Sequence, residues 1–209
     1  GYQLLELFQS EAQFAMQLLA AEEGNLRRAL GLGRRHEQPD AVKGVLYGLK
    51  KLMDMQGRWT EWERLVRELE AEASDADGAP LPGRESLWRA LLGHRAEIAQ
   101  RQRDWAAAEA ALLRLRDHYQ GAGDDRNAAA TLHQLGRIAE ERRQFDEAER
   151  WYRQSLAIKE RIGNAHGQAS TLHHLGMIAQ ERRQFDEAER WYRQSLAIKE
   201  HIGDEHGQA

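Results

Sequence analysis

The sequence predicts an all-α protein built as an α-solenoid, in which antiparallel helix pairs stack one after another. Three observations predict this fold. The nineteen-residue segment RRQFDEAERWYRQSLAIKE occurs at 142–160 and again, forty residues later, at 182–200. Its apolar residues follow helical spacing, and the 209-residue chain is rich in helix-forming residues with only three prolines. Repetition at such a period is typical of stacked arrays, because each unit buries its apolar face against its neighbour.

The repeat extends beyond the identical segment. Residues 131–163 and 171–203 align without a gap and differ at only four of 33 positions. The differing pairs are Gln134/His174, Arg137/Met177, Glu140/Gln180 and Arg161/His201. A diverged copy lies forty residues upstream, and a more irregular one lies 46 residues before that. We therefore divide the chain into a helical lead-in (1–38), an irregular helix pair with its loop (39–83), a diverged repeat (84–124), two near-identical repeats (125–164 and 165–204) and the start of a further repeat (205–209).

Each element follows from apolar spacing and from signals at its ends. The pattern predicts helices over 11–33, 40–56, 59–74, 84–102, 105–119, 125–142, 145–162, 165–182 and 185–202. The loop SDADGAPLPG at 74–83 holds two of the three prolines. Gly163 suits the left-handed position that ends a helix, and Asn164 or Asp204 can cap the helix that follows. Two-residue to four-residue connections of this kind place consecutive helices antiparallel.

The two helices of each repeat carry different apolar faces. The first has one stripe, and Gly136 within it indicates close helix–helix approach rather than a turn. The second has two adjacent stripes, which is expected for a helix packed between its partner and the next unit. The expected core comprises Leu132, Leu135, Gly136, Ala139, Phe145, Ala148, Trp151 and Tyr152, and in the next repeat Leu172, Leu175, Gly176, Ala179, Phe185, Ala188, Trp191 and Tyr192.

The order of these residues resembles the tetratricopeptide repeat (TPR) family. Its pattern of a large residue, Leu-Gly and a small residue, followed by an aromatic, Ala and an aromatic, matches Leu132, Leu135-Gly136, Ala139, Phe145, Ala148 and Tyr152. The resemblance implies a right-handed superhelix whose first helices line a concave face that receives ligands. The forty-residue period exceeds the family's usual ~34 and is similar to kinesin light chain-type repeats.

A looser resemblance covers the lead-in. The segments AAEEGNLRRAL and DMQGRWTEWERLVRELE are similar to the region that follows the nucleotide-binding domain in bacterial STAND-type signalling ATPases. In that class, such repeats form the sensor that receives the inducer. The sequence has no GxxxxGK[S/T] loop, so an ATPase would have to lie outside it.

Composition narrows the function classes. The net charge of −4 argues against a nucleic-acid binder, and no apolar run approaches the ~18 residues of a membrane span. The absence of cysteine fits a reducing compartment, and no signal peptide is recognisable, so we expect a cytoplasmic protein. Neither a Ser-His-Asp nor an HExxH pattern is present, so we expect no enzyme, no cofactor and no metal site. His133 and His173 are interpreted as groove residues duplicated with their repeat.

Three of the four repeat differences, at 134/174, 137/177 and 140/180, are spaced by three and so share one helix face. We assign this face to the ligand groove, although drift after a recent duplication would explain the same differences. The candidate ligand contacts are Arg95, Gln100, His133, Arg137, Glu140, His173, Met177 and Gln180.

These features favour a scaffold that binds a protein or peptide ligand. One alternative is end-to-end self-association through the last helix, 185–202, which we expect to expose an apolar stripe. Another is nucleic-acid or phosphate binding through arginine ridges formed by Arg142, Arg143, Arg150 and Arg153 and by Arg182, Arg183, Arg190 and Arg193. Interleaved carboxylates favour a mixed surface instead. Trp151 and Trp191 are interpreted as core between repeats rather than as an aromatic platform.

Overall fold

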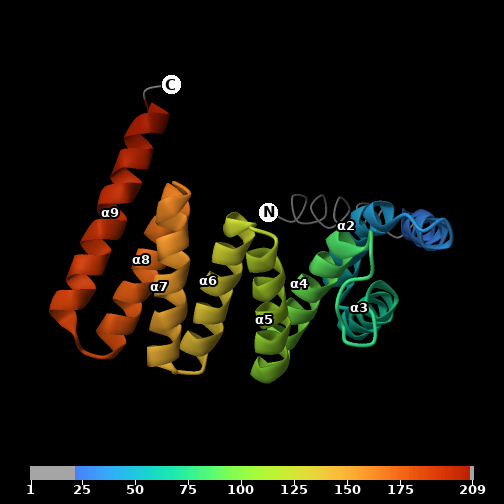
Figure 1. Cartoon of the computed structure of the whole chain (residues 1–209), viewed down its shortest axis with the longest axis horizontal. Helices are drawn as coiled ribbons and strands as arrows, with labels where there is room; N and C mark the ends of the chain where they lie inside the picture. Colours follow the sequence, from blue (N-terminus) through green and yellow to red (C-terminus); the bar gives the residue numbers. More distant parts are fainter. Residues whose placement is uncertain (1–21, 208–209) are drawn as a thin grey trace, which may run out of the picture. The chain divides into compact units, whose positions relative to one another are not determined.

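The structure, a computed structural model, describes residues 22–207, which fall into two compact units divided between Arg95 and Ala96. Helices make up most of both units (Figure 1). Between residues 22 and 207 the only β-type pairing is an isolated bridge from Ser74 to Pro80. The predicted all-α class is therefore confirmed.

The first unit contains a helix over 22–35, then α2 (Pro39–Gln56) and α3 (Trp59–Ala73). The start of the helix expected at 11–33 lies outside the described residues. Leucines of α2 and Trp62 of α3 are fully buried and form the core of this unit. The loop that follows is held by Asp75, whose carboxylate accepts the backbone N–H groups of Asp77 and Ala79. The indole of Trp88 donates to the carbonyl of Gly78 at 2.9 Å and pins this loop to the next helix.

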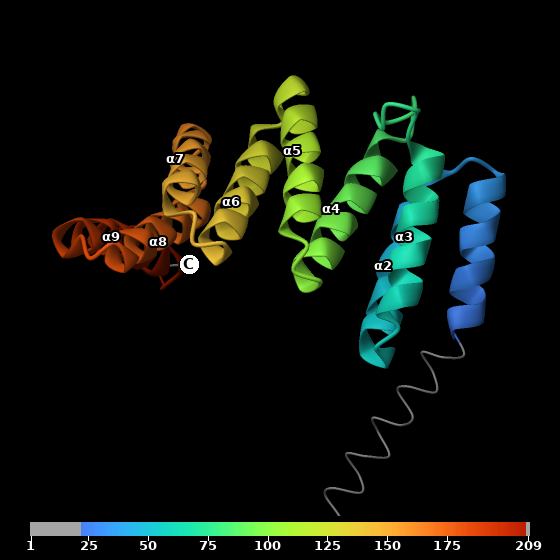
Figure 2. The ribbon, with the colours of Figure 1, turned by 90° about the horizontal axis from the view of Figure 1, so that it is seen from below.

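Helix α4 (Glu85–Arg101) crosses the boundary between the units. The second unit continues with α5 (Trp105–Gly121), α6 (Asp125–Glu141), α7 (Phe145–Arg161), α8 (Ala165–Glu181) and α9 (Phe185–Gly207). From α5 to α9, each helix packs against the next one, as Figures 1 and 2 both show. From residue 39 onward, these bounds agree with the predicted ones within two residues, except at the end of α9.

The last helix corrects one prediction. We expected it to end near 202, with Asp204 capping another helix, but α9 continues through Gly203 to Gly207. In the preceding repeat, the turn at Gly163 is held because α8 folds back onto α7 and Asn164 caps it, accepting the N–H of Gly167 at 2.9 Å. After Gly203, no helix among the described residues packs back onto α9, so nothing holds such a turn there.

Two kinds of turn connect the helices of the second unit. Between repeats, Gly123 and Gly163 adopt φ of 68°, as the predicted glycine turn requires. Within repeats, the left-handed position is taken by arginine instead, with φ of 57° at Arg103, 56° at Arg143 and 59° at Arg183. A side chain is disfavoured in this conformation, so the sequence offered no sign of these turns.

Most of the expected core is buried, but one residue is not. Phe185 is 65% exposed, whereas Phe145, at the equivalent position of α7, is half-buried. Trp191 and Tyr192 are also half-buried. Phe185 was assigned to the core by analogy with the preceding repeat, and that assignment is wrong because no helix in the described part of the chain covers this side of α9.

Candidate functional site

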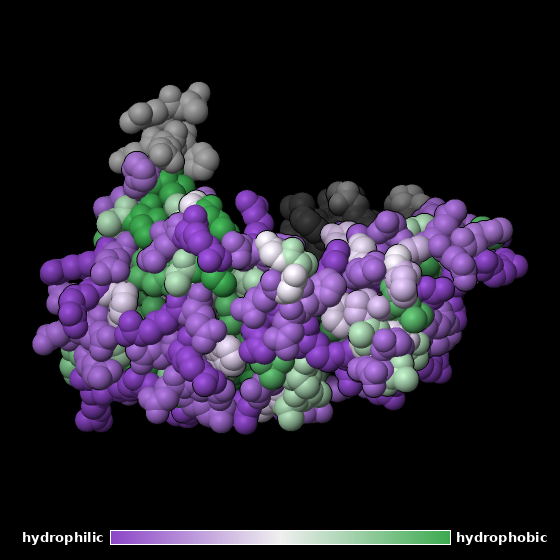
Figure 3. All heavy atoms as spheres, viewed as in Figure 1, coloured by the Kyte–Doolittle hydropathy of each residue, from purple (hydrophilic) through white to green (hydrophobic). Residues whose placement is uncertain are grey.

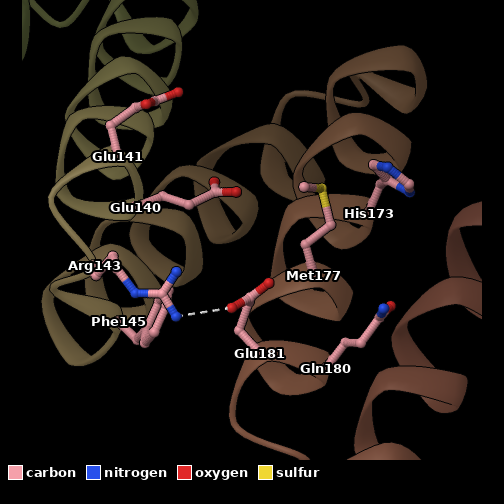
Figure 4. A pocket seen from close by; sticks show the side chains of 8 residues that line it. All are labelled: Glu140, Glu141, Arg143, Phe145, His173, Met177, Gln180 and Glu181. Atoms are coloured by element: carbon pink, nitrogen blue, oxygen red, sulfur yellow. Dashed lines mark hydrogen bonds and ion pairs between the residues drawn. The ribbon is translucent and has the colours of Figure 1, made fainter.

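A groove of about 540 Å³ opens beside α8 and the turn between α6 and α7 (Figure 4). Its walls come from the last turn of α6, the start of α7 and one face of α8. The lining residues are Glu140, Glu141, Arg143, Phe145, His173, Met177, Gln180 and Glu181. The apolar part of the wall includes Met177, whose side chain is 37% exposed. The repeat geometry therefore gathers an apolar surface and several charged groups in one place.

Four of the eight predicted contact residues meet at this groove, namely Glu140, His173, Met177 and Gln180. Arg137 is exposed on α6 but is not part of the lining. Gln100 lies at the end of α4, also outside the lining, and Arg95 belongs to the first unit. There, the Arg95 guanidinium pairs with the buried carboxylate of Glu70 at 2.9 Å, so its role in the structure is an ion pair.

The junction between the two near-identical repeats is a polar network around Glu140. Its Oε2 accepts the hydroxyl of Tyr152 at 2.7 Å and lies 3.0 Å from Nδ1 of His174 on α8. The ring of His174 stacks on that of Tyr152 with 5.1 Å between centroids. Burial acts to raise the pKa of Glu140, but the hydrogen bonds from His174 and Tyr152 outweigh it and hold the pKa below its usual value. Glu140 is therefore an ionised carboxylate at neutral pH.

His133 lies deeper in the same junction than the groove interpretation required. Its Nδ1 is 3.2 Å from the hydroxyl of Thr171, which also accepts from the buried Lys159 amine at 2.8 Å. Burial, with the nearby Lys159 charge, lowers the pKa of His133 to about 3. Burial alone lowers the pKa of Lys159 to about 8. His133 is thus a neutral packing residue and does not line the groove.

The network also explains two of the four repeat differences in a way that the sequence interpretation missed. Glu140 and His174 occupy the positions that hold Gln180 and Gln134 in the other copy, and they contact each other across the junction. These two changes therefore form one complementary pair between successive repeats. Met177 and Gln180 do line the groove, so the differing helix face is divided between junction and groove.

Comparison with known proteins agrees with this geometry. Two tetratricopeptide repeat models match the chain, one over residues 89–161 and the other over 168–207. The chain belongs to the tetratricopeptide repeat family. No curated protein matches it. Proteins built from TPR units are in general scaffolds that bind other proteins rather than enzymes.

Solved TPR-like structures share the fold at low sequence identity. BtubC (BKLC) from P. vanneervenii superimposes with a TM-score of 0.72 at 20% identity, over 88% of this chain and 74% of that one. A putative kinesin light chain from Podosopora anserina with nearly identical TPR-like repeats gives 0.63 at 17% identity, over 92% and 97% of the two chains. Its Q17M variant gives 0.64 at 16% identity, over 93% and 97%. The resemblance to kinesin light chain-like repeats is thereby confirmed at the level of the fold.

Four groove residues of this TPR protein were not predicted as contacts, namely Glu141, Arg143, Phe145 and Glu181. They lie at helix ends and in the turn, where the repeat alignment shows no difference between the copies. The predicted contacts lie along the face of the first helix that carries the differences, so residues in the turn and on the second helix were not among them. Their position in the repeat would have indicated them, because the C-terminal end of the first helix in one repeat faces the first helix of the next repeat.

The arginines of the predicted ridges are largely paired with carboxylates. Arg142 contacts Glu109 at 2.8 Å, and Arg182 contacts Glu149 at 2.7 Å. Arg150 and Arg153 pair with Glu147 and Glu149 of their own helix. Trp151 is buried, with the guanidinium groups of Arg116 and Arg150 over its ring. These contacts favour the mixed-surface interpretation of the ridges over a phosphate-binding one.

The far side of α9 exposes the apolar stripe that we expected there. Phe185 and Leu196 are 65% and 55% exposed, and Figure 3 shows hydrophobic residues reaching the surface around α9. A second hollow of about 460 Å³ is lined by Gln180, Phe185, Ala188, Glu189, Tyr192, Arg193 and Leu196. Residues 185–200 are identical to 145–160, whose equivalent surface on α7 is covered by α8.

No group of three or more histidine, cysteine or acidic residues in the described part of the chain has the geometry to hold a metal ion. None of the helices between residues 22 and 207 combines the length and the hydropathy that crossing a bilayer demands.

Proposed function

We propose that this TPR protein is an interaction scaffold whose groove between the α6–α7 turn and α8 receives a peptide segment of a partner protein. The observation that carries this proposal is the groove itself, where three other predicted contact residues lie around the exposed Met177. Methionine is a flexible, polarisable side chain that adapts to varied ligand surfaces. A groove this size fits a few side chains of an extended peptide rather than a whole domain.

A selection from a random twelve-residue peptide library displayed on phage tests the proposal. We expect peptides to be enriched on the wild-type chain and to lose binding when Met177→Glu places a charge on the groove wall. Gln154→Glu is the matched control, because Gln154 is exposed on α7 and outside the groove. A chain that enriches no peptide, or whose peptides bind the Met177→Glu variant equally well, would contradict the proposal.

We further infer, from the resemblance of the lead-in, that the scaffold serves as the sensor arm of a STAND-type signalling protein in the cytoplasm. The relevant segments, 20–30 and 54–70, include Arg58, which pairs with Glu23 at 2.8 Å within the first unit. The gene sequence upstream of Gly1 tests this inference. A strand, a GxxxxGK[S/T] loop and a helix encoded there would support it, and a different domain would overturn it.

Self-association is a second candidate function, and the exposed stripe on α9 favours it. The stripe has the same residues as the surface of α7 that α8 covers, so its chemistry suits an amphipathic helix. The occupant that we propose is a second copy of this chain, packed against α9 through the same stripe. Two such stripes facing each other would remove both exposed phenylalanines from water.

A further inference from the structure

We propose that the groove recognises a cationic segment, in which an arginine or lysine lies beside an apolar residue. This inference rests on the proposed function and adds the chemistry of the partner. The basic side chain would lie against Glu140 and Glu141, and the apolar one would lie against Met177 and Phe145.

The charges that line the groove do not balance. Three carboxylates, Glu140, Glu141 and Glu181, face a single guanidinium, that of Arg143. Arg143 is already engaged, because it pairs with Glu181 at 3.1 Å and lies over the Phe145 ring at 5.2 Å. After this pairing, two carboxylates remain without a lining cation.

His173, the one histidine among the lining residues, does not supply the missing positive charge. Burial, together with the charge of Lys199, lowers the pKa of His173, so its ring is neutral at pH 7. Arg137 lowers the pKa of Glu140 through space from α6, but it is not among the lining residues. The groove is therefore electronegative at neutral pH.

Glu140 offers a specific acceptor within this field. Its two hydrogen-bonded neighbours, Tyr152 and His174, both reach Oε2. Within residues 22–207, no hydrogen bond reaches Oε1, and Figure 4 shows the Glu140 side chain extending into the groove. A half-buried ionised oxygen gains most from a charged donor, because such hydrogen bonds are about twice as strong as neutral ones. Glu141 stands next to it, exposed and without a basic partner in the described residues.

The apolar wall of the groove favours an apolar residue next to the basic residue of the ligand. Met177 extends from α8 toward the middle of the groove in Figure 4, on the side opposite Glu140. A leucine or methionine adjacent to the ligand's basic residue would cover it. An acidic segment is disfavoured, because it would bring its carboxylates against Glu140 and Glu141 while the one lining cation, Arg143, is paired with Glu181.

The test uses the peptides selected from the library on the intact chain. We expect enrichment of sequences with arginine or lysine next to leucine, methionine or phenylalanine. In fluorescence anisotropy, replacing the arginine of a selected peptide by citrulline, a neutral group of the same shape, should weaken binding at least tenfold. Raising NaCl from 50 to 300 mM should weaken it several-fold.

Protein variants locate the contact. Glu140→Gln should weaken binding of the arginine peptide about tenfold, and Glu141→Gln about threefold. The chain itself shows that glutamine fits at the first position, because Gln180 accepts the Tyr192 hydroxyl at 3.0 Å in the next repeat. Glu160→Gln is the control, since Glu160 is exposed on α7 outside the groove and its change should leave the affinity within 1.5-fold, about experimental error.

The outcomes separate the inference from the proposed function. Selected peptides that are acidic or neutral, yet still lose binding to Met177→Glu, would overturn the cationic preference and leave the scaffold proposal intact. Basic peptides that bind Glu140→Gln and Glu141→Gln as well as the wild type would also overturn it. A library that yields no binder would count against both.

Discussion

Gly136 and Gly176 set the distance between the two helices of each repeat. A Cβ on Gly136 would lie 2.6 Å from Cε1 of Tyr152, and one on Gly176 equally close to Cε1 of Tyr192. The expected close approach is thus confirmed at both positions. The two tyrosines differ in freedom, because Tyr152 is fully buried and Tyr192 is half-buried.

We predict that Gly136→Ala destabilises the protein by about 1–3 kcal/mol, since the Tyr152 ring has no space to move into. Gly176→Ala should change stability by less than about 1 kcal/mol, because Tyr192 can shift toward solvent and alanine favours the helix. Urea denaturation of both variants measures the difference. Equal destabilisation would show that the burial of the tyrosine is not what matters.

His133 should make stability depend on pH. Its pKa in the folded chain is about 3, below its usual 6.5, so between these values only the unfolded chain takes up the proton. The free energy of unfolding should therefore fall as pH drops below 6.5, by about 1–3 kcal/mol at pH 4.5. Urea titrations of the wild type and of His133→Gln at pH 7 and 4.5 measure the share of this fall that His133 causes. If both proteins lose the same free energy of unfolding between the two pH values, His133 is not the cause.

At the scale of elements, several polar contacts recur from one repeat to the next, and one contact across a repeat junction does not. Ser155 and Ser195 donate to the carbonyls of Ala129 and Ala169 at 2.8 and 2.7 Å, so this bond is copied with the repeat. The contact from Glu140 to His174 has no copy at the equivalent positions. It distinguishes the junction between α6–α7 and α8–α9 from the others.

We predict a favourable coupling of about 0.5–1.5 kcal/mol between Glu140 and His174. The double-mutant cycle uses Glu140→Gln and His174→Gln, which each install the residue of the other repeat and so preserve its packing. The free energies of unfolding of the four proteins at pH 7 give the coupling. If the effects of the two substitutions on the free energy of unfolding are additive, Glu140 and His174 do not stabilise each other.

The arginine turns give a second prediction at this scale. Arg183 has φ of 59° and no ion-pair partner among the described residues, so no contact of its side chain offsets the strain of its left-handed backbone. Arg183→Gly should stabilise the protein by about 1 kcal/mol. Thermal unfolding should show a higher midpoint for this variant and a lower one for Gly163→Ala. An unchanged midpoint for Arg183→Gly would mean that the arginine side chain makes a stabilising contact that offsets the backbone strain.

At the scale of the whole molecule, the exposed stripe on α9 determines how the chain behaves at high concentration. We predict that the wild-type chain self-associates as concentration rises, and that Phe185→Ser with Leu196→Ser keeps it monomeric. Sedimentation velocity across a concentration series measures the change. Gln194→Ser, an exposed polar change on the same helix, should behave as the wild type. A wild-type chain that stays monomeric at every concentration would contradict self-association as a function.

Local pattern alone was enough to determine the helices, their order and the glycine turns. Apolar spacing and turn residues act over a few positions, so the forty-residue period revealed both helix pairs and the residues that hold each pair together. It also located half of the candidate groove, because differences between copies gather on one helix face.

Only the tertiary structure decided what each copy of a repeated residue does. Tyr152 and Tyr192 have the same sequence neighbours, yet one is fully buried and the other is half-buried, because burial depends on which helix packs next. For the same reason, His174 proved to be a partner of Glu140 across a junction, and α9 ran on past Gly203. A contact such as that between Glu140 and His174, which joins two successive repeats, depends on packing in three dimensions, and the repeat pattern along the chain does not predict it.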